Sequence, residues 1–96
     1  MYKLKFLPSA LREWKKLAVP IREQLRKKLK ERLGNPRIPA SRLHGFADVY
    51  KIKLRSSGYR LVYEVNDKEV TVLVIAVGKR EKGKVYSRSK GRLTDS

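Results

Sequence analysis

The stretch YKIKLRSSGYRLVY, residues 50–63, has a regular alternation of side chains. Apolar and charged residues alternate on both sides of the break at Ser56-Ser57-Gly58, which is the pattern of two β-strands joined by a short turn. Like charges that face each other across a strand pair are destabilising, yet cations crowd this hairpin. A surface that costs stability indicates a binding or catalytic role. The cations are Lys51, Lys53, Arg55 and Arg60.

The length of the turn determines which residues face one another. A turn made of Ser57 and Gly58 would place Arg55 opposite Arg60. A loop from Arg55 to Gly58 would instead place Lys53 opposite Arg60. Both registers put the same cations on one face of the hairpin, away from Tyr50, Ile52, Leu54 and Leu61. The cations that share this face in both registers are Lys51, Lys53 and Arg60.

The charge balance limits the kinds of partner that fit this chain. The sequence has 25 Lys and Arg against 9 Asp and Glu in 96 residues, a formal net charge of +16. Self-repulsion on this scale favours a polyanionic partner, with nucleic acid first and an acidic protein second. A hydrophobic content of 41% indicates a folded chain, and the length suits one domain over residues 1–96.

Several site chemistries are excluded by composition. The chain has no cysteine and only one histidine, His44, so neither a thiolate nor a multi-histidine metal site can form. The longest apolar run, residues 72–77, is far short of the ~20 residues that span a bilayer. The N-terminus does not resemble a signal peptide. We therefore expect a soluble, cytoplasmic protein with no membrane partner.

The first third of the chain predicts a strand followed by two helices. Residues 2–6 alternate apolar side chains with lysines, which indicates a short strand. Ser9 is the expected N-cap of the first helix. Pro20 suits the first turn of the second helix, and Gly34 ends it. The apolar stripes are Leu11, Trp14, Leu17 and Ala18 in the first helix and Ile21, Leu25, Leu29 and Leu33 in the second.

The remainder of the chain predicts a loop, three strands and a basic tail. Residues 35–48 contain two prolines and lack periodicity, which indicates a loop before the hairpin. Residues 69–77 are nearly all apolar and β-branched, which suits a central strand covered on both faces. The tail, residues 81–96, is expected to be partly helical. The predicted fold is α+β: an N-terminal strand, a two-helix hairpin on a mainly antiparallel sheet of about four strands, and a short C-terminal helix or tail.

Two residues outside the hairpin can join its basic face. Arg80 follows the last predicted strand and can hang over the same face. Tyr86 can return over it from the tail, which would give a concave basic surface with one aromatic ring. Taken singly, a cation on a strand is more often a solubilising residue than part of a site. A tyrosine at this position packs against the sheet about as often as it joins a site. Their combination is what favours a site.

Clustered cations bind phosphate and stabilise the charge that develops on it. A neighbouring cation at about 7 Å, with an effective dielectric constant near 20, lowers the pKa of a lysine by about 1.7 before solvent screening. A lysine at the centre of the cluster is therefore a reasonable general base, whereas arginine is suited to clamping phosphate. Metal-dependent cleavage needs clustered carboxylates. Because the nearby acids are scattered, we expect neither a metal nor a cofactor; these acids are Asp48, Glu64, Asp67 and Glu69.

Over nearly its whole length the chain resembles the RelE-type toxins of bacterial and archaeal toxin–antitoxin systems. The segments that carry the resemblance are LREWKKL, REQLRKKL, NPRI, YKIKLRSSGYRLVYEV and VIAVGKRE…VY, in that order. The resemblance implies the microbial-ribonuclease-like toxin fold. It also implies a metal-independent endoribonuclease that cuts mRNA in the ribosomal A site. In that reaction the 2′-hydroxyl is the nucleophile and a 2′,3′-cyclic phosphate is left.

The resemblance also implies roles for individual residues. Lys53 would be the general base, and Arg80 would protonate or stabilise the leaving 5′-oxygen. Lys51 and Arg60 would stabilise the pentacovalent phosphate, and Tyr86 would stack on or orient the displaced base. Positioning by the ribosome would supply in-line geometry that the site lacks alone.

Other cations are expected to contact the backbone of mRNA or rRNA. A run of cations on a helix is more often a solvated face, so the high net charge is what favours contact with RNA. His44 departs from relatives that carry arginine after the NPRI loop. A histidine in such a loop more often has no role, and the functional interpretation is a weaker contact with mRNA or rRNA. The expected RNA-binding residues are Lys27, Lys28, Arg32, His44, Arg55, Lys79, Lys82 and Lys84.

The expected partners are the 70S ribosome with mRNA in its A site, the rRNA backbone, and a cognate acidic RelB-type antitoxin that is partly disordered. Three other interpretations stay open. One is a non-enzymatic toxin of the gyrase-inhibiting type, and another is a RelE homologue whose activity has decayed. The third is a plain nucleic-acid-binding module that uses the second helix and the tail, with a steep salt dependence and no cleavage.

Overall fold

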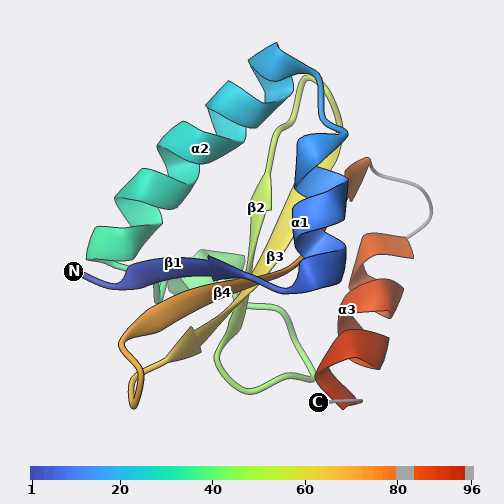
Figure 1. The fold of residues 1–96 in the computed structure, drawn as a ribbon. Helices are drawn as coiled ribbons and strands as arrows, with labels where there is room; N and C mark the ends of the chain where they lie inside the picture. Colours follow the sequence, from blue (N-terminus) through green and yellow to red (C-terminus); the bar gives the residue numbers. More distant parts are fainter. Residues whose placement is uncertain (80–83, 95–96) are drawn as a thin grey trace.

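In residues 1–79 and 84–94, which the computed structural model describes, four strands form one sheet in the order β1-β4-β3-β2 (Figure 1). β1 is parallel to β4, and the other neighbours are antiparallel. The predicted α+β class is confirmed. The elements are β1 (Lys3–Phe6), α1 (Pro8–Lys15), α2 (Val19–Gly34), a 3-10 turn (Pro39–Ser41), β2 (Val49–Lys53), β3 (Tyr59–Asn66), β4 (Thr71–Lys79) and α3 (Lys84–Thr94).

β4 lies between β1 and β3 and is covered on both faces. Val72 and Val74 belong to the cluster packed against α1 and α2. Ile75 belongs to a second cluster, on the opposite face, which contains Val85 of α3. The prediction of a central strand buried on both faces is therefore confirmed.

The ends of β4 differ from the prediction of residues 69–77. The preceding turn continues to Val70, which has a φ of 53°, so the strand begins at Thr71. At the other end β4 includes Gly78 and Lys79 because both still pair with β3. β4 therefore ends two residues later than its apolar run indicates.

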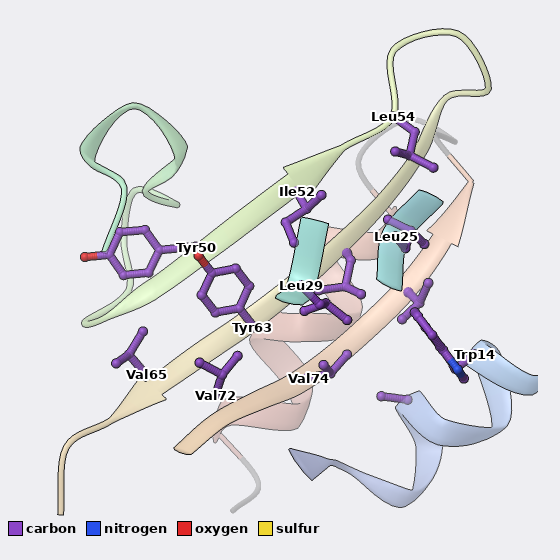
Figure 2. Close-up of a cluster of buried hydrophobic side chains, with 13 residues drawn as sticks. Trp14, Leu25, Leu29, Tyr50, Ile52, Leu54, Tyr63, Val65, Val72 and Val74 are labelled. Carbon is purple, nitrogen blue, oxygen red and sulfur yellow. The ribbon is translucent and has the colours of Figure 1, made fainter. Parts of the chain in front are cut away.

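The larger core lies between the sheet and the two N-terminal helices. Leu25 and Leu29 of α2 are fully buried against the sheet, and Trp14 of α1 joins the same cluster. Figure 2 shows these side chains together with Ile52 of β2 and Tyr63 of β3. The apolar face of the hairpin is therefore the face that the helices cover, as the alternation predicted.

The boundaries of the helices follow proline and glycine. α1 starts at Pro8, and its N-cap residue Leu7 makes no side-chain capping bond, so the predicted N-cap at Ser9 is wrong. Proline suits this first position because its nitrogen has no hydrogen to leave unpaired. Pro20 lies in the first turn of α2, which ends at Gly34, as predicted.

α1 is shorter than its apolar stripe indicated. It ends at Lys15, so Leu17 and Ala18 lie between the two helices. Leu11 remains 36% exposed. No helix in the described part of the chain is long and apolar enough to cross a membrane. The buried residues of α1 are Ala10 and Trp14.

The register of the β2–β3 hairpin is the one with the longer loop. Lys53 pairs with Arg60 and Lys51 pairs with Val62. The loop closes through a bond from the Gly58 N–H to the Leu54 carbonyl, and Gly58 has a φ of 77° that favours glycine. Two cations therefore face each other directly across the hairpin.

A β-bulge changes the alternation of β4. Val62 of β3 pairs with Ala76 and Tyr63 pairs with Val74, which leaves Ile75 as the extra residue. Ile75 and Ala76 consequently pack in the same cluster as Val85 of α3, and Val77 packs on the other face, with α1 and α2. The bulge thus shifts the side-chain alternation of β4 by one residue, so that Val74 and Val77 both pack in the cluster under α1 and α2.

A buried hydrogen-bond network joins α2 to the sheet. The Tyr63 hydroxyl donates to the Pro36 carbonyl at 2.6 Å and accepts from Arg32 Nη1 at 2.8 Å. Arg32 Nη2 also donates to Ser41 Oγ at 3.2 Å. Burial raises the pKa of Tyr63, although Arg32 opposes this effect. The network fixes the loop after α2 against β3.

Replacing Tyr63 by phenylalanine should lower the free energy of unfolding by about 1–3 kcal/mol, because a buried carbonyl and a guanidinium each lose a partner. Urea denaturation measures this change. The matched control is Tyr50→Phe, since the Tyr50 ring stacks on Tyr63 at 5.8 Å and is also buried. Equal losses for the two variants would contradict the structural role of the Tyr63 hydroxyl.

Candidate active site

The face of the sheet opposite α1 and α2 carries the hairpin cations. Lys51 and Lys53 of β2 and Arg60 of β3 alternate with residues that pack under the helices, so the predicted shared face is confirmed. Lys53 is exposed, whereas Lys51 and Arg60 are half-buried. The three cations are therefore held together by the same alternation that buries the opposite face.

Tyr86 lies in the first turn of α3 and contacts two of these cations. Arg60 Nη1 donates a hydrogen bond to the Tyr86 hydroxyl at 2.7 Å. The Arg60 guanidinium carbon lies 5.6 Å from the centre of the ring, and Lys51 Nζ lies 5.9 Å from it. These are cation–π distances, and the contact offsets part of the repulsion between the cations. The expected return of Tyr86 over the basic face is confirmed.

Lys53 lines several hollows in the surface, and two of them are also lined by another cation of this face. One, of about 240 Å³, is lined by the β2–β3 turn together with Arg60. The other, of about 350 Å³, lies between β2, α2 and the 3-10 turn. The structure thus brings three predicted RNA-binding residues beside the predicted catalytic lysines. The charged residues around the second hollow are Lys28, Arg32, Lys51, Lys53 and Arg55.

Arg32 makes more contacts inside the protein than its place in a basic helix indicated. Its guanidinium bonds to Tyr63 and Ser41, lies 5.8 Å from the Tyr63 ring, and approaches the Lys51 carbonyl at 3.4 Å. Its position supports a role in holding β2 against α2. Among the basic residues of this hollow, Lys28, Lys53 and Arg55 are the exposed ones.

The remaining predicted residues are spread over the surface. Lys27 is exposed on α2, and His44 is exposed in the loop before β2. Lys79 is exposed at the end of β4. Arg80 and Lys82 lie outside the described residues, and Lys84 is the first residue of α3.

The acids that could have relieved the cationic repulsion lie elsewhere. Glu69 pairs with Lys5 of β1 at 3.6 Å, on the strand at the opposite edge of the sheet from β2. Glu64 pairs with Val49, at the far end of the hairpin from Lys53. In residues 1–79 and 84–94, no group of three or more acidic or histidine side chains could hold a metal ion.

Sequence reasoning missed the residues that fasten α3 over this face. Arg92 of α3 makes two hydrogen bonds to Glu13 of α1, at 2.8 and 3.2 Å. Arg88 forms a further ion pair with Glu13 at 3.4 Å. The local signal in the sequence was a lone acid in a helix whose other charged residues are basic, and a contact across 79 positions has no periodic signature.

The fold is that of a toxin of a type II toxin–antitoxin system. Residues 4–83 match the family model described as the ParE toxin of the type II toxin–antitoxin system parDE. The chain is 59% identical over 92 residues to the mRNA interferase toxin RelE of Escherichia coli strain K12, covering 96% of this chain and 97% of that relative. It therefore belongs to the RelE-type toxins of this family.

Solved structures of relatives have the same fold. A mutant E. coli RelE toxin in the free state superposes with a TM-score of 0.89 at 58% identity, covering 96% of this chain and 97% of that one. The toxin in the intact E. coli RelBE toxin–antitoxin complex superposes with a TM-score of 0.83 at 60% identity, covering 85% of this chain and all of that one. The predicted toxin fold is therefore confirmed.

Lys53→Gln should weaken binding of a short single-stranded RNA and reduce the slope of log K against log salt by about 0.7, the value for one lost phosphate contact. Fluorescence anisotropy at several salt concentrations measures both quantities. Lys68→Gln is the matched control, because Lys68 is exposed in the turn at the other end of the sheet. The same loss of slope in both variants would show that only net charge matters.

Proposed function

We propose that this protein is an mRNA interferase, which cuts mRNA in the ribosomal A site without a metal. The observation that carries the proposal is the contact of Tyr86 with Arg60 and Lys51 beside Lys53, in a chain 59% identical to an mRNA interferase toxin. Cations alone would serve any polyanion. An aromatic ring held among them supplies a surface on which a base can stack.

The reaction that these residues suit is attack by a 2′-hydroxyl on the adjacent phosphate. Lys53 takes the proton of the hydroxyl, the bond from O2′ to phosphorus forms, and the bond from phosphorus to O5′ breaks. Lys51 and Arg60 stabilise the additional negative charge on the phosphate. Arg80 protonates or stabilises the leaving 5′-oxygen, and Tyr86 orients the base. The products are a 2′,3′-cyclic phosphate and a 5′-hydroxyl.

The ribosome supplies the geometry that this open face lacks. In-line attack requires the 2′-oxygen, phosphorus and 5′-oxygen to be aligned, and a flexible RNA seldom adopts that arrangement. Holding reactants in a near-attack geometry can contribute about 7–11 kcal/mol to the barrier reduction. An exposed cationic surface that depends on this contribution would leave free RNA uncut.

The basic hollow beside β2 is suited to guide the RNA to the site. Lys28 and Arg55 are exposed there next to Lys53, and their charges would bind backbone phosphates on either side of the cleaved bond. The exposed Lys27, His44 and Lys79 lie outside this hollow. They would contact rRNA more peripherally, together with Lys82 and Lys84.

An acidic antitoxin completes the proposal. Relatives have been solved as the RelBE toxin–antitoxin complex and with an antitoxin RelB peptide. A chain with a net charge of +16 would bind a RelB-type antitoxin through its acidic residues. Both proteins and their ribosomal target would be cytoplasmic.

Primer extension on mRNA bound to programmed ribosomes with an empty A site tests the proposed activity. Cleavage within the A-site codon on the ribosome, with none in the same mRNA free in solution, is the expected result. Folded protein that cuts neither sample would contradict the proposal. It would leave a decayed toxin or a gyrase-inhibiting one, which a DNA supercoiling assay separates.

Lys53→Ala and Arg80→Ala should each slow single-turnover cleavage on the ribosome by at least about 10²-fold, because a proton acceptor or a stabiliser of developing charge is lost. Circular dichroism should show an unchanged fold. Lys30→Ala is the control, since Lys30 is exposed on α2 and lines none of the hollows described beside Lys53. Full activity of both site variants would exclude the assigned roles.

A further inference from the structure

The edge of β4 beyond β1 is closed by side chains rather than by a strand. β1 pairs with β4 only from Thr71 to Val74. Past that point the Val77 N–H donates to Glu13 Oε1 at 3.1 Å. The Ile75 carbonyl accepts from Arg92 Nη1 at 2.8 Å. A carboxylate from α1 and a guanidinium from α3 therefore satisfy backbone groups that would otherwise lie open at the sheet edge.

The same carboxylate binds α3 directly. Arg92 meets both oxygens of Glu13, and the side chains of the pair are each 21% exposed. Arg88 adds a more exposed ion pair at 3.4 Å. Burial alone would raise the pKa of Glu13, but the bonds from Arg92 and Val77 and the charge of Arg88 outweigh it and lower the pKa. Two-pronged, half-buried pairs of this kind are stronger than ordinary surface pairs.

α3 connects this ion-pair cluster to the basic face of the sheet. Arg88 and Arg92 contact Glu13, whereas Tyr86 of the same helix contacts Arg60 and Lys51. At about 100° per residue, Arg88 lies about 160° and Arg92 about 120° around the helix axis from Tyr86, so the contacts with Glu13 and with the basic face lie on different sides of α3. Figure 1 shows α3 lying beside α1 at the edge of the sheet. Because a helix is rigid, the contacts of α3 with Glu13 on one side also hold the Tyr86 ring in place on the other side.

α3 packs closely against β4 at Gly78. A Cβ added at Gly78 would lie 3.1 Å from Val85 Cγ2 and would collide with the guanidinium of Arg88. Gly78 pairs with Arg60 across β3 and β4. The helix therefore rests directly on the backbone beside the site, so a small displacement of α3 would be transmitted to the Tyr86–Arg60 contact.

We infer that Glu13 is a positioning residue for Tyr86: it clamps α3 to α1 and to the open edge of β4, and so holds the ring against Lys51 and Arg60. Its consequence for the reaction rests on the proposed mRNA interferase activity. Glu13 touches neither the ring nor the cations of the site in the contacts described, and its effect passes through Arg88 and Arg92.

Glu13→Gln tests this inference, with Glu23→Gln as the matched control. Both changes remove one negative charge from a helix, but Glu23 is exposed and pairs with Arg26 within α2. Amide hydrogen exchange in Glu13→Gln should accelerate at least tenfold in α3, with β3 unchanged. The Tyr86 ring signals should shift in the NMR spectrum. The control should match the wild type in both measurements.

Cleavage on the ribosome provides a readout that a merely structural role would not produce. Glu13→Gln should slow single-turnover cleavage about tenfold when Tyr86 is present, and should cause no further loss in a Tyr86→Ala background. An equal loss in both backgrounds, or faster exchange over the whole chain, would overturn the inference. Should Glu13→Gln not fold, Arg92→Lys loosens the same clamp from α3 while keeping the charge.

A wild-type protein that cuts no mRNA would overturn the proposed function without deciding the clamp. The exchange rates of α3 and the Tyr86 ring signals then decide the positioning role by themselves. Unchanged values for both in Glu13→Gln would reject it.

Discussion

The alternation of side chains in the β2–β3 hairpin places the core on one face of the sheet and the cations on the other. Fully burying an aliphatic or aromatic side chain contributes roughly 1.5–3 kcal/mol, and Ile52, Leu54 and Leu61 are all buried under α1 and α2. The repulsion of facing cations costs less than about 1 kcal/mol per pair. Burial therefore determines which face the cations occupy, and the four-residue loop then places Lys53 opposite Arg60 on that face.

α3 adds an aromatic ring to this surface of mutually repelling cations. The strands supply the cations, but the aromatic ring comes from Tyr86, which is 26 positions after Arg60 in the chain. A cation–π contact contributes about 0.5–1 kcal/mol at an exposed position, which is too little to hold a helix by itself. The packing of Val85 and the ion pairs of Arg92 with Glu13 supply the remainder. The docking of α3 therefore brings the aromatic ring into the site.

The sequence predicted those features that depend on local periodicity. The shared face of Lys51, Lys53 and Arg60 follows from a period of two, but the register could not be chosen because both loop lengths satisfy the same pattern. Arg32 looked like a surface cation, and only the tertiary fold brings the Tyr63 hydroxyl to it. The bulge in β4 and the Glu13 clamp are likewise contacts between distant segments, which leave no periodic trace.

In the proposed reaction, this face of the sheet acts on a phosphate that is attacked by the 2′-hydroxyl of the adjacent ribose. The most direct test uses ribosome-bound mRNA in which hydrogen replaces the 2′-hydroxyl at the nucleotide on the 5′ side of the cleaved bond. The all-ribose mRNA should be cut to a 2′,3′-cyclic phosphate, identified by mass spectrometry, and the 2′-deoxy mRNA should not be cut at that bond. Cleavage of both at equal rates would contradict the proposed reaction.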